Sequence, residues 1–356
     1  METGYTPWPE AVAAIATQRG AVLLLGATDT GKTTLARWAA NHALAAGRAV
    51  ALVDGDVGQS EIGSPGTIGL ARPEAPFESY ASLRARALAF VGDTSPVGHL
   101  LAVVGGVQSL LRHALDRGAE LILLDTPGLI QGRMGEKLHV ATAQATQPTL
   151  LVGLARGAEL DRLVALCEAA CGAPSLRVRT PPEADRKTAL YRKSKRAHQV
   201  ATYFARARPI ELPGAQVIPF DGWPFTGQPL AAHLLRLAAD CLETEIYHAE
   251  ETPDGLCFCT AQRPTRTQMV HLQEAFGRRR LVVTPAAWFR YLMVGCLAES
   301  GRLAAVGLLQ GVNFQRRVYS LLTPAASLAN VRTLWYGRYR VQPDGTELGR
   351  LRPGDL

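Results

Sequence analysis

Residues 26–33 have the composition and spacing of a phosphate-binding loop. They fit the pattern G-x-x-x-x-G-K-[ST], in which glycines let backbone N–H groups curl around phosphate oxygens at a helix N-terminus. We expect Lys32 to bridge the β- and γ-phosphates during catalysis, and the Thr33 hydroxyl to ligate Mg²⁺. The predicted nucleotide-binding residues are Gly26, Thr28, Asp29, Thr30, Gly31, Lys32, Thr33 and Thr34.

Three aspartates follow other apolar runs and could handle protons or a metal ion. Asp54 and Asp56 come just after the run at residues 49–53, and Asp125 follows a later one. Because functional groups gather at the carboxyl ends of parallel strands, we expect all three beside the P-loop. Asp56 is the predicted general base, and Asp54 and Asp125 are the predicted metal or water ligands. A simple Asp-Gly turn is the alternative interpretation of residues 54–56.

Residues 125–128, Asp-Thr-Pro-Gly, also fit the D-x-x-G signature of GTPases. This match raises a second hypothesis, a GTPase or ATPase switch that acts through a protein partner. The chain has no N-K-x-D guanine-recognition motif, and ordinary GTPases do not need the pair Asp54 and Asp56. We therefore favour a phosphotransferase and keep the switch as the alternative.

Residues 186–208 contain eight basic residues and no acidic one. Arg192 and Arg196 are four residues apart, so in a helix at about 186–204 they share a face. A mobile basic helix would act as a lid that neutralises the charge of phosphoryl transfer and excludes water, which makes both arginines catalytic candidates. A solvated basic face is the alternative, but solvated faces usually mix charges of both signs.

The order of predicted elements indicates an α/β fold with a parallel sheet. Buried strands are expected at 21–25, 49–53, 121–124 and 150–153, with helices at 32–46 and 99–117 after a helical lead-in within 1–20. Beyond about residue 225 a helix at 229–242 precedes short β-like segments at 281–283, 303–309, 318–322 and 336–341. We therefore predict a P-loop kinase domain at residues 1–228 and a smaller β-rich domain at 229–356.

The composition is that of a folded chain of about two domains, with 356 residues, 47% apolar and 19% charged. The chain has 38 lysines and arginines and 31 aspartates and glutamates. Where this excess of positive charge is clustered, it indicates a site for phosphates. The six cysteines lack metal-site spacing, so we expect reduced core thiols. Without a signal peptide or an apolar run of roughly 20 residues, the expectation is a cytoplasmic protein with no membrane association.

The ordered set of motifs resembles the polynucleotide 5′-hydroxyl kinase family. This family includes the kinase subunit of the eukaryotic pre-messenger-RNA cleavage complex, ribosomal-RNA-processing kinases and shorter prokaryotic relatives. The resemblance extends over nearly the whole chain. The matching segments are the P-loop with Asp29 two residues before its second glycine, residues 54–59, 64–67, 90–96 with 98–99, 125–128, the basic segment through 203–204, 307–311 and 344–349.

The resemblance implies roles for further residues. ATP or GTP with Mg²⁺ would be the donor, and Asp56 would activate the 5′-hydroxyl of single-stranded RNA or DNA. The implied substrate-binding residues are Gln59, Thr94, Ser95, His99, Thr126 and Gly128, of which the last two form a clasp on phosphate. In the lid, Arg186 or Lys187 is a further candidate beside the two arginines.

Two departures from the family pattern bear on recognition. The clasp commonly continues with tryptophan, whereas Leu129 follows Gly128 here, so the grip on nucleic acid is expected to differ. The large relatives carry an N-terminal β-domain that holds the nucleotide base, and with roughly 25 residues before this P-loop we do not expect one here. The choice between ATP and GTP therefore stays open.

Arginines and aromatic residues mix at 288–291, 314–319 and 335–340. Such mixtures could form a surface for single-stranded nucleic acid, since bases stack on aromatic rings and phosphates pair with arginines. Ordinary strand packing is the favoured interpretation for any one of them. RNA and DNA are not distinguished by these segments.

Overall fold

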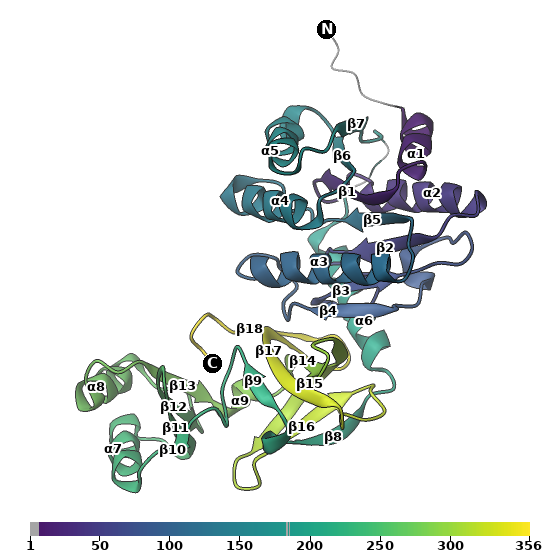
Figure 1. Ribbon diagram of the computed structural model, residues 1–356. Helices are drawn as coiled ribbons and strands as arrows, with labels where there is room; N and C mark the ends of the chain where they lie inside the picture. Colours follow the sequence, from purple (N-terminus) through teal and green to yellow (C-terminus); the bar gives the residue numbers. More distant parts are fainter. Residues whose placement is uncertain (1–6, 183, 185) are drawn as a thin grey trace. The chain divides into compact units, whose positions relative to one another are not determined.

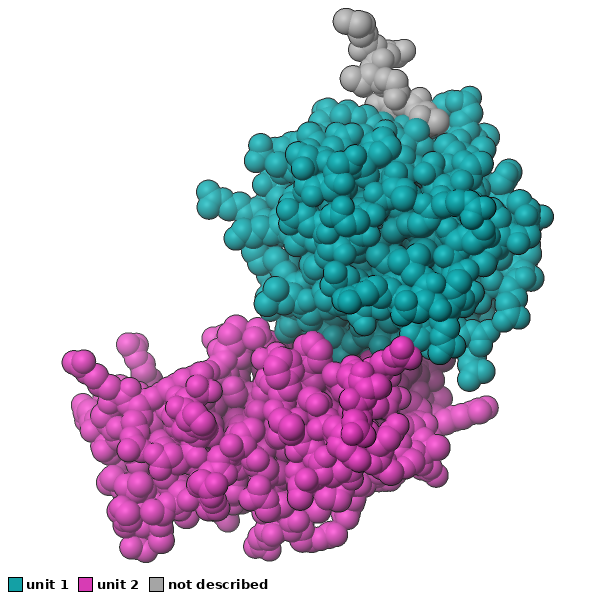
Figure 2. Space-filling view, viewed as in Figure 1, with its two compact units in different colours: residues 1–199 teal, residues 200–356 magenta. Residues whose placement is uncertain are grey.

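The computed structural model describes residues 7–182, 184 and 186–356. The chain divides into two compact units, Met1–Gln199 and Val200–Leu356, drawn in different colours in Figure 2. We call them the N-terminal unit and the C-terminal unit.

The N-terminal unit is built on a seven-stranded sheet among its described residues, in the order β4-β3-β2-β5-β1-β6-β7. Strands β2, β5, β1, β6 and β7 run parallel. The strands are β1 (Gly20–Gly26), β2 (Val50–Asp54), β3 (Thr67–Ala71), β4 (Ala87–Phe90), β5 (Leu121–Asp125), β6 (Leu150–Ala155) and β7 (Ser175–Arg179). The helices are α1 (Trp8–Ala16), α2 (Lys32–Ala45), α3 (Leu100–Asp116), α4 (Gly132–Thr146), α5 (Asp161–Cys171) and the start of α6 (Ala189–Phe204).

Helices cover both faces of this sheet, as Figure 1 shows. In β1, Leu23 and Leu25 pack in the core that includes residues of α3, α4 and α5. Val22 and Leu24 face the opposite core, with residues of α1 and α2. Because both faces are buried, the strands are continuous apolar runs rather than alternating ones. The predicted P-loop α/β architecture is confirmed.

The sheet is not wholly parallel, which corrects one detail of the prediction. The four predicted strands are present, but β3 pairs antiparallel with β2, and β4 pairs antiparallel with β3. The connection from β2 to β3 contains no helix. Without a helical crossover the chain returns antiparallel, so β3 and β4 form an antiparallel edge on a parallel sheet.

The C-terminal unit is β-rich, as predicted, and contains two sheets among its described residues. One has the order β18-β17-β14-β15-β16-β8 with β9 beside β17, and the other has the order β10-β11-β12-β13. The strands are β8 (Arg208–Pro213), β9 (Ile218–Phe220), β10 (Gln228–Pro229), β11 (Ile246–Thr252), β12 (Gly255–Thr260), β13 (Leu281–Pro285), β14 (Leu292–Ala298), β15 (Leu303–Asn313), β16 (Val318–Thr323), β17 (Val331–Val341) and β18 (Glu347–Arg350). The helices are α7 (Ala232–Leu242), α8 (Arg266–Phe276) and α9 (Ala286–Phe289).

The division between the units differs from the predicted boundary at residue 228. Strand β8 pairs with β16, and β9 pairs with β17, so residues 208–220 belong to the C-terminal sheet. The division falls between Gln199 and Val200, inside α6. The partners of β8 and β9 lie about 110 residues further along the chain. Local patterning does not reveal such pairing.

In two of the three aromatic and arginine-rich segments, 314–319 and 335–340, tyrosines pack in the interior of the C-terminal unit. Tyr319, Tyr336 and Tyr339 are at most 2% exposed. Arg316 pairs with Glu211 through two contacts of 2.9 and 3.1 Å.

The six cysteines are free thiols. Among the described residues no helix has both the length and the apolar character needed to cross a bilayer.

Candidate active site

The P-loop connects β1 to α2, as its sequence pattern predicts. Gly31 adopts a left-handed conformation with φ of 94° directly before the helix, where a side chain would be strained. Asp29 is also left-handed, with φ of 61°. The Lys32 ammonium is buried and donates to the carbonyls of Gly26 and Ala27, each at 2.9 Å. Lys32, the lysine of the pattern, is thus also the first residue of α2, so the lysine and the helix N-terminus lie together at the loop.

Thr33 and Asp125, two of the three residues predicted to bind metal, contact each other. Thr33 Oγ1 donates to Asp125 Oδ2 across 2.5 Å. Burial raises the pKa of Asp125 to about 6, although Lys32 and the Thr33 hydroxyl favour its charged form. A hydroxyl and a carboxylate in contact beside a phosphate-binding loop are oxygen donors of the kind that Mg²⁺ prefers.

Asp54 and Asp56 have different environments although they are only two residues apart. Asp54 is buried, and its Oδ2 accepts hydrogen bonds from the backbone N–H groups of Glu61 (2.6 Å) and Ile62 (3.1 Å). Burial, and then the neighbouring Asp125, raise the pKa of Asp54 to about 8. Asp56 is half-buried and accepts one hydrogen bond from Gly58 N at 3.1 Å. Asp56 is therefore the more accessible carboxylate of the pair.

The carboxylates fit a magnesium ion held jointly by protein, water and phosphate. Mg²⁺ usually takes one or two protein carboxylates and fills its octahedron with water and phosphate oxygens. Within the described part of the chain, no three His, Cys, Asp or Glu side chains are grouped as an all-protein metal cage would require. Asp125 and Asp54 are buried close enough to repel each other when both are charged. A divalent cation bound between them would offset this repulsion.

A polar cavity of about 130 Å³ brings most of the predicted site together. Its walls come from the P-loop, the segment after β2, the end of β5 and the basic segment. The lining residues are Thr28, Asp29, Thr30, Gly31, Lys32, Thr33, Thr34, Asp54, Asp56, Gln59, Glu61, Tyr80, Asp125, Lys187 and Lys195. Of the predicted acceptor-site residues, only Gln59 is among them.

The other predicted substrate residues lie outside this cavity. Three of them lie in the loop 94–99, where the Asp93 carboxylate accepts a hydrogen bond from Ser95 N at 3.1 Å and lies 3.5 Å from His99 Nε2. A Cβ at Gly58 would lie 2.8 Å from the Thr94 carbonyl, so this loop abuts the segment that carries Asp56. The substrate-binding roles of the loop remain predictions.

The two clasp residues, Thr126 and Gly128, make contacts that support the P-loop. The Thr126 hydroxyl is buried and donates to the Leu24 carbonyl of β1 at 2.6 Å. A Cβ at Gly128 would lie 2.2 Å from Thr28 Oγ1 and 2.6 Å from Thr28 N. Gly128 is therefore required for the close approach of the clasp to the P-loop backbone. Contact of either residue with phosphate stays a prediction.

The basic segment is a helix, and it contacts both sides of the cavity within the N-terminal unit. Arg192 Nη1 donates to Asp29 Oδ2 at 3.1 Å, on the P-loop side. On the side of Asp56, Lys195 forms an ion pair with Glu61, and Gln199 donates to the Ser60 carbonyl at 2.6 Å. Neither predicted lid arginine, Arg192 or Arg196, is among the residues that line the cavity. The helix begins at Ala189 rather than at about 186.

Three cavity residues were not predicted from the sequence, namely Glu61, Tyr80 and Lys195. Glu61 and Lys195 could have been found as an acid–base pair only with the helix register known. The Tyr80 side chain is 1% exposed, and its hydroxyl has no hydrogen-bond partner among the described residues. Burial, and then the charges of Asp125 and Asp54, raise the pKa of Tyr80 well above its usual value. No sequence motif marks this tyrosine.

Comparisons with known proteins identify the family of the chain. The profile of the family described as "mRNA cleavage and polyadenylation factor CLP1 P-loop" matches residues 26–206. A curated polyribonucleotide 5′-hydroxyl-kinase of Thermococcus kodakarensis is 32% identical over 338 residues, covering 94% of this chain and 92% of the relative. The corresponding protein of Methanocaldococcus jannaschii is 28% identical over 332 residues, covering 93% of this chain and 89% of the relative.

The fold is also similar to that of a solved structure. A wild-type Clp1p–Pcf11p complex matches with a TM-score of 0.58 and 14% identity, covering 92% of this chain and 77% of the matched chain. At this identity the likeness concerns the fold alone. The profile match and the nearly full-length archaeal relatives confirm the resemblance inferred from the motifs. The chain therefore belongs to the CLP1 P-loop family, together with curated polyribonucleotide 5′-hydroxyl-kinases.

Proposed function

We propose that this chain transfers the γ-phosphate of ATP to the 5′-hydroxyl end of RNA. The observation that carries the proposal is the single cavity that contains both the P-loop and Asp56. Asp56 lines the same cavity as the loop that would hold the transferred phosphoryl group, which supports its proposed role as the general base. A hydrolytic switch needs no such carboxylate, whereas a kinase acting on a hydroxyl does.

Each group has a role in in-line transfer. The P-loop N–H groups and Lys32 hold the β- and γ-phosphates. The oxygen of the 5′-hydroxyl bonds to the γ-phosphorus, and Asp56 accepts the hydroxyl proton. At the same time the bond between the γ-phosphorus and the bridging oxygen of the β-phosphate breaks, and the nucleoside diphosphate leaves. Mg²⁺ held by Thr33 and Asp125, with Asp54 close by, would neutralise phosphate charge.

The basic helix α6 supplies the remaining positive charge. Arg192 already lies against the P-loop through Asp29, and exchange of that carboxylate for a γ-phosphate oxygen would place its guanidinium on the transferring group. Lys195 of α6, and Lys187 just before the helix, line the same cavity and add positive charge there. Arg196 is proposed to contact the acceptor strand rather than the donor.

RNA is the proposed acceptor because the relatives that match nearly the whole chain are named for polyribonucleotide ends. ATP is the proposed donor, and use of GTP is part of the test. We also propose that residues 1–199 contain the complete donor and proton-transfer machinery, because every lining residue of the cavity lies there.

Transfer of labelled γ-phosphate tests the proposal. ATP and GTP are each offered with three acceptors of one sequence: 5′-hydroxyl RNA, 5′-hydroxyl DNA and 5′-phosphorylated RNA. The proposal predicts label on the 5′-hydroxyl RNA with ATP and none on the phosphorylated control. Release of free phosphate at equal rates with all three acceptors, with no labelled oligonucleotide, would contradict it and favour the switch hypothesis.

A further inference from the structure

The C-terminal unit contains a cavity of about 470 Å³ that the proposed transfer reaction does not use. It lies within that unit, where the turn between β11 and β12 and the start of β13 meet strand β17 and the segment after β18. The volume lies within the range of about 300–1,000 Å³ that is typical of small-molecule sites. The cavity is large enough for one nucleotide.

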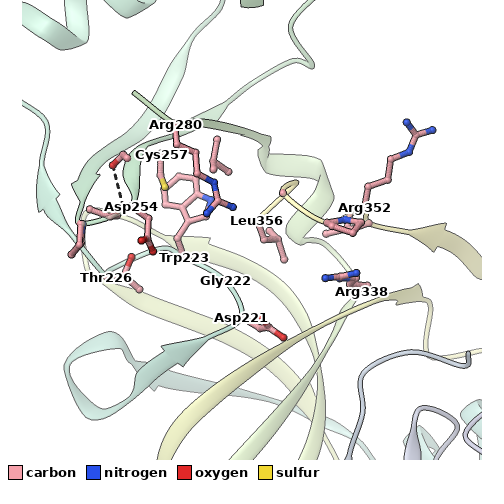
Figure 3. A pocket seen from close by; sticks show the side chains of 17 residues that line it. Asp221, Gly222, Trp223, Thr226, Asp254, Cys257, Arg280, Arg338, Arg352 and Leu356 are labelled. Carbon is pink, nitrogen blue, oxygen red and sulfur yellow. Dashed lines mark hydrogen bonds between the residues drawn. The ribbon is translucent and has the colours of Figure 1, made fainter. Parts of the chain in front are cut away.

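Three arginines line this cavity, namely Arg280, Arg338 and Arg352. In Figure 3 the guanidinium groups of Arg280 and Arg338 face the cavity from two sides, whereas Arg352 extends away from it. Within the described part of the chain, no side-chain hydrogen bond or ion pair joins any of the three guanidinium groups to a protein group. The adjacent Arg279, in contrast, forms an ion pair with Glu251 at 2.9 Å.

The backbone beneath the two facing arginines is fixed by strand pairing. The Arg280 carbonyl accepts from Leu256 N, and the Arg338 carbonyl accepts from Leu351 N, each at 2.9 Å. Gly255 approaches so closely that a Cβ there would lie 2.1 Å from the Arg280 carbonyl oxygen. The positions of the two arginines are therefore set by the fold, and only their side chains need to adjust to a ligand.

The cavity also contains two carboxylates, Asp221 and Asp254. Carboxylates repel an anion, so they would not help the cavity to bind a simple dianion. A nucleotide, in contrast, combines an anionic phosphate with ribose hydroxyls and base amino groups that donate hydrogen bonds to carboxylates. Two arginines for the phosphate and two aspartates for the donors match that mixed chemistry, because guanidinium groups bind phosphate oxygens in pairs.

We propose that this cavity, here called the arginine pocket, binds a nucleotide with Arg280 and Arg338 on its phosphate. The nucleotide can be a free mononucleotide or one unit of an RNA strand, since both offer the same phosphate and ribose. The second source rests on the proposed function, because it treats the pocket as a holding site for the acceptor strand. The pocket is distinct from the P-loop site, which lies in the other unit.

Equilibrium binding to the full chain tests the proposal, with the P-loop saturated by ADP and Mg²⁺. One probe is AMP, followed by calorimetry, and the other is a 3′-labelled, 5′-phosphorylated RNA oligonucleotide, followed by fluorescence anisotropy. The variants are Arg280→Gln and the double variant Arg280→Gln/Arg338→Gln. The control is Arg278→Gln, which removes an exposed arginine of the same turn that does not line the pocket. Thermal unfolding checks that each variant is folded.

The double variant is expected to bind at least one probe about tenfold more weakly or worse, because two charge-assisted contacts are lost. Loss with both probes means that the pocket takes a nucleotide in either form, and loss with RNA alone identifies the strand as the source. For RNA, the slope of log K against log salt should also decrease by about 0.7 per phosphate contact removed.

Arg280 is exposed, so Arg280→Gln alone should not disturb the fold. It should give part of the same loss of binding, which keeps the test valid if the double variant is unstable. Unchanged binding of both probes and an unchanged salt slope would overturn the pocket, as would an equal loss in Arg278→Gln. Wild-type transfer of phosphate to RNA is measured in parallel. Absence of that transfer would count against the proposed function, whereas unchanged binding with normal transfer would count against the pocket alone.

Discussion

Arg192 Nη1 lies 3.1 Å from Asp29 Oδ2, so the basic helix is hydrogen-bonded to the phosphate-binding loop. The Asp29 carboxylate also accepts from Lys187 N at 3.0 Å. The Arg192 side chain is 31% exposed, while that of Asp29 is 9% exposed. A cation is therefore held at the P-loop by a carboxylate that a phosphate oxygen could replace. This arrangement gives the lid hypothesis a specific contact.

Arg192→Ala is predicted to lower kcat/KM for phosphoryl transfer by about 100-fold or more, because a positioned donor to the transferring group is lost. The thermal midpoint should change little, since a partly exposed ion pair contributes only about 0.2–1 kcal/mol. Steady-state transfer and thermal unfolding of the same preparations give both values. The control is Lys193→Ala, an exposed neighbour on α6 that should retain full activity. Equal activity of the two variants would remove Arg192 from the mechanism.

Tyr80→Phe is predicted to reduce activity without reducing stability. The buried hydroxyl has no hydrogen-bond partner among the described residues, so its removal leaves no group unsatisfied. Because it lies in the cavity with Asp54 and Asp125, we expect it to donate to the water shell of Mg²⁺. Loss of such an outer contact typically costs about 10- to 100-fold in metal affinity or activity.

The readouts for Tyr80→Phe are the Mg²⁺ dependence of transfer and binding of Mn²⁺ to the ADP complex, detected by electron paramagnetic resonance. A higher metal requirement in both assays, with a thermal midpoint equal to or above that of the wild type, is the expected result. An unchanged metal requirement would make Tyr80 a packing residue.

Gly128→Ala is predicted to displace the P-loop, because a Cβ would lie 2.6 Å from Thr28 N. A backbone atom cannot move aside as a flexible side chain does, so a shift of the loop of about 1 Å should lower transfer by about 100-fold. Gly105→Ala is the matched control, because nothing lies within 4 Å of its Cβ and it is exposed on helix α3. There alanine should stabilise the chain by roughly 0.5–1 kcal/mol. Full activity of Gly128→Ala would show that the clasp is not coupled to the P-loop.

The raised pKa values of Asp54, about 8, and Asp125, about 6, predict how stability depends on pH without metal. Above about pH 4 the unfolded chain has released these protons while the folded chain still binds them, so the free energy of unfolding decreases as pH rises toward 8. Mg²⁺ bound with ADP relieves the carboxylate charge and should raise the thermal midpoint more at pH 8 than at pH 5.

Thermal unfolding with ADP, measured from pH 5 to pH 8 with Mg²⁺ and with a chelator, checks this dependence. The gain from Mg²⁺ should grow with pH in the wild-type chain and grow less steeply in Asp125→Asn, in which Asp54 remains the titrating carboxylate. A gain that is the same at every pH would place the metal away from these two carboxylates.

The sequence predicted the parts of the site that are formed by consecutive residues. The P-loop is such a segment, since strand, glycines and helix follow one another. Asp54 and Asp125 could be placed because they end strands of the same parallel sheet, and Asp56 follows Asp54 by two residues. The apolar runs of these strands are long enough to identify them without knowledge of their neighbours.

The features that were missed depend on contacts between distant residues. Tyr80 lines the cavity and packs in the core that contains residues of α2 and β2, a position that no local pattern indicates. On α6, the choice between Lys195 and Arg196 depends on helix rotation, and only Lys195 lines the cavity. Strands β8 and β9 are recognised only through their pairing with β16 and β17.

The most direct test of the account is single-turnover transfer of labelled γ-phosphate from ATP to a 5′-hydroxyl RNA oligonucleotide, by the wild type and by Asp56→Asn. Asp56 is half-buried at the cavity. Asparagine has nearly the same volume as aspartate, so the substitution removes the proton acceptor and leaves the packing unchanged. We predict label at the RNA 5′ end with the wild type, and a rate lower by about 10²–10⁴-fold in Asp56→Asn with ATP binding unchanged. Transfer by Asp56→Asn at the wild-type rate would contradict the account.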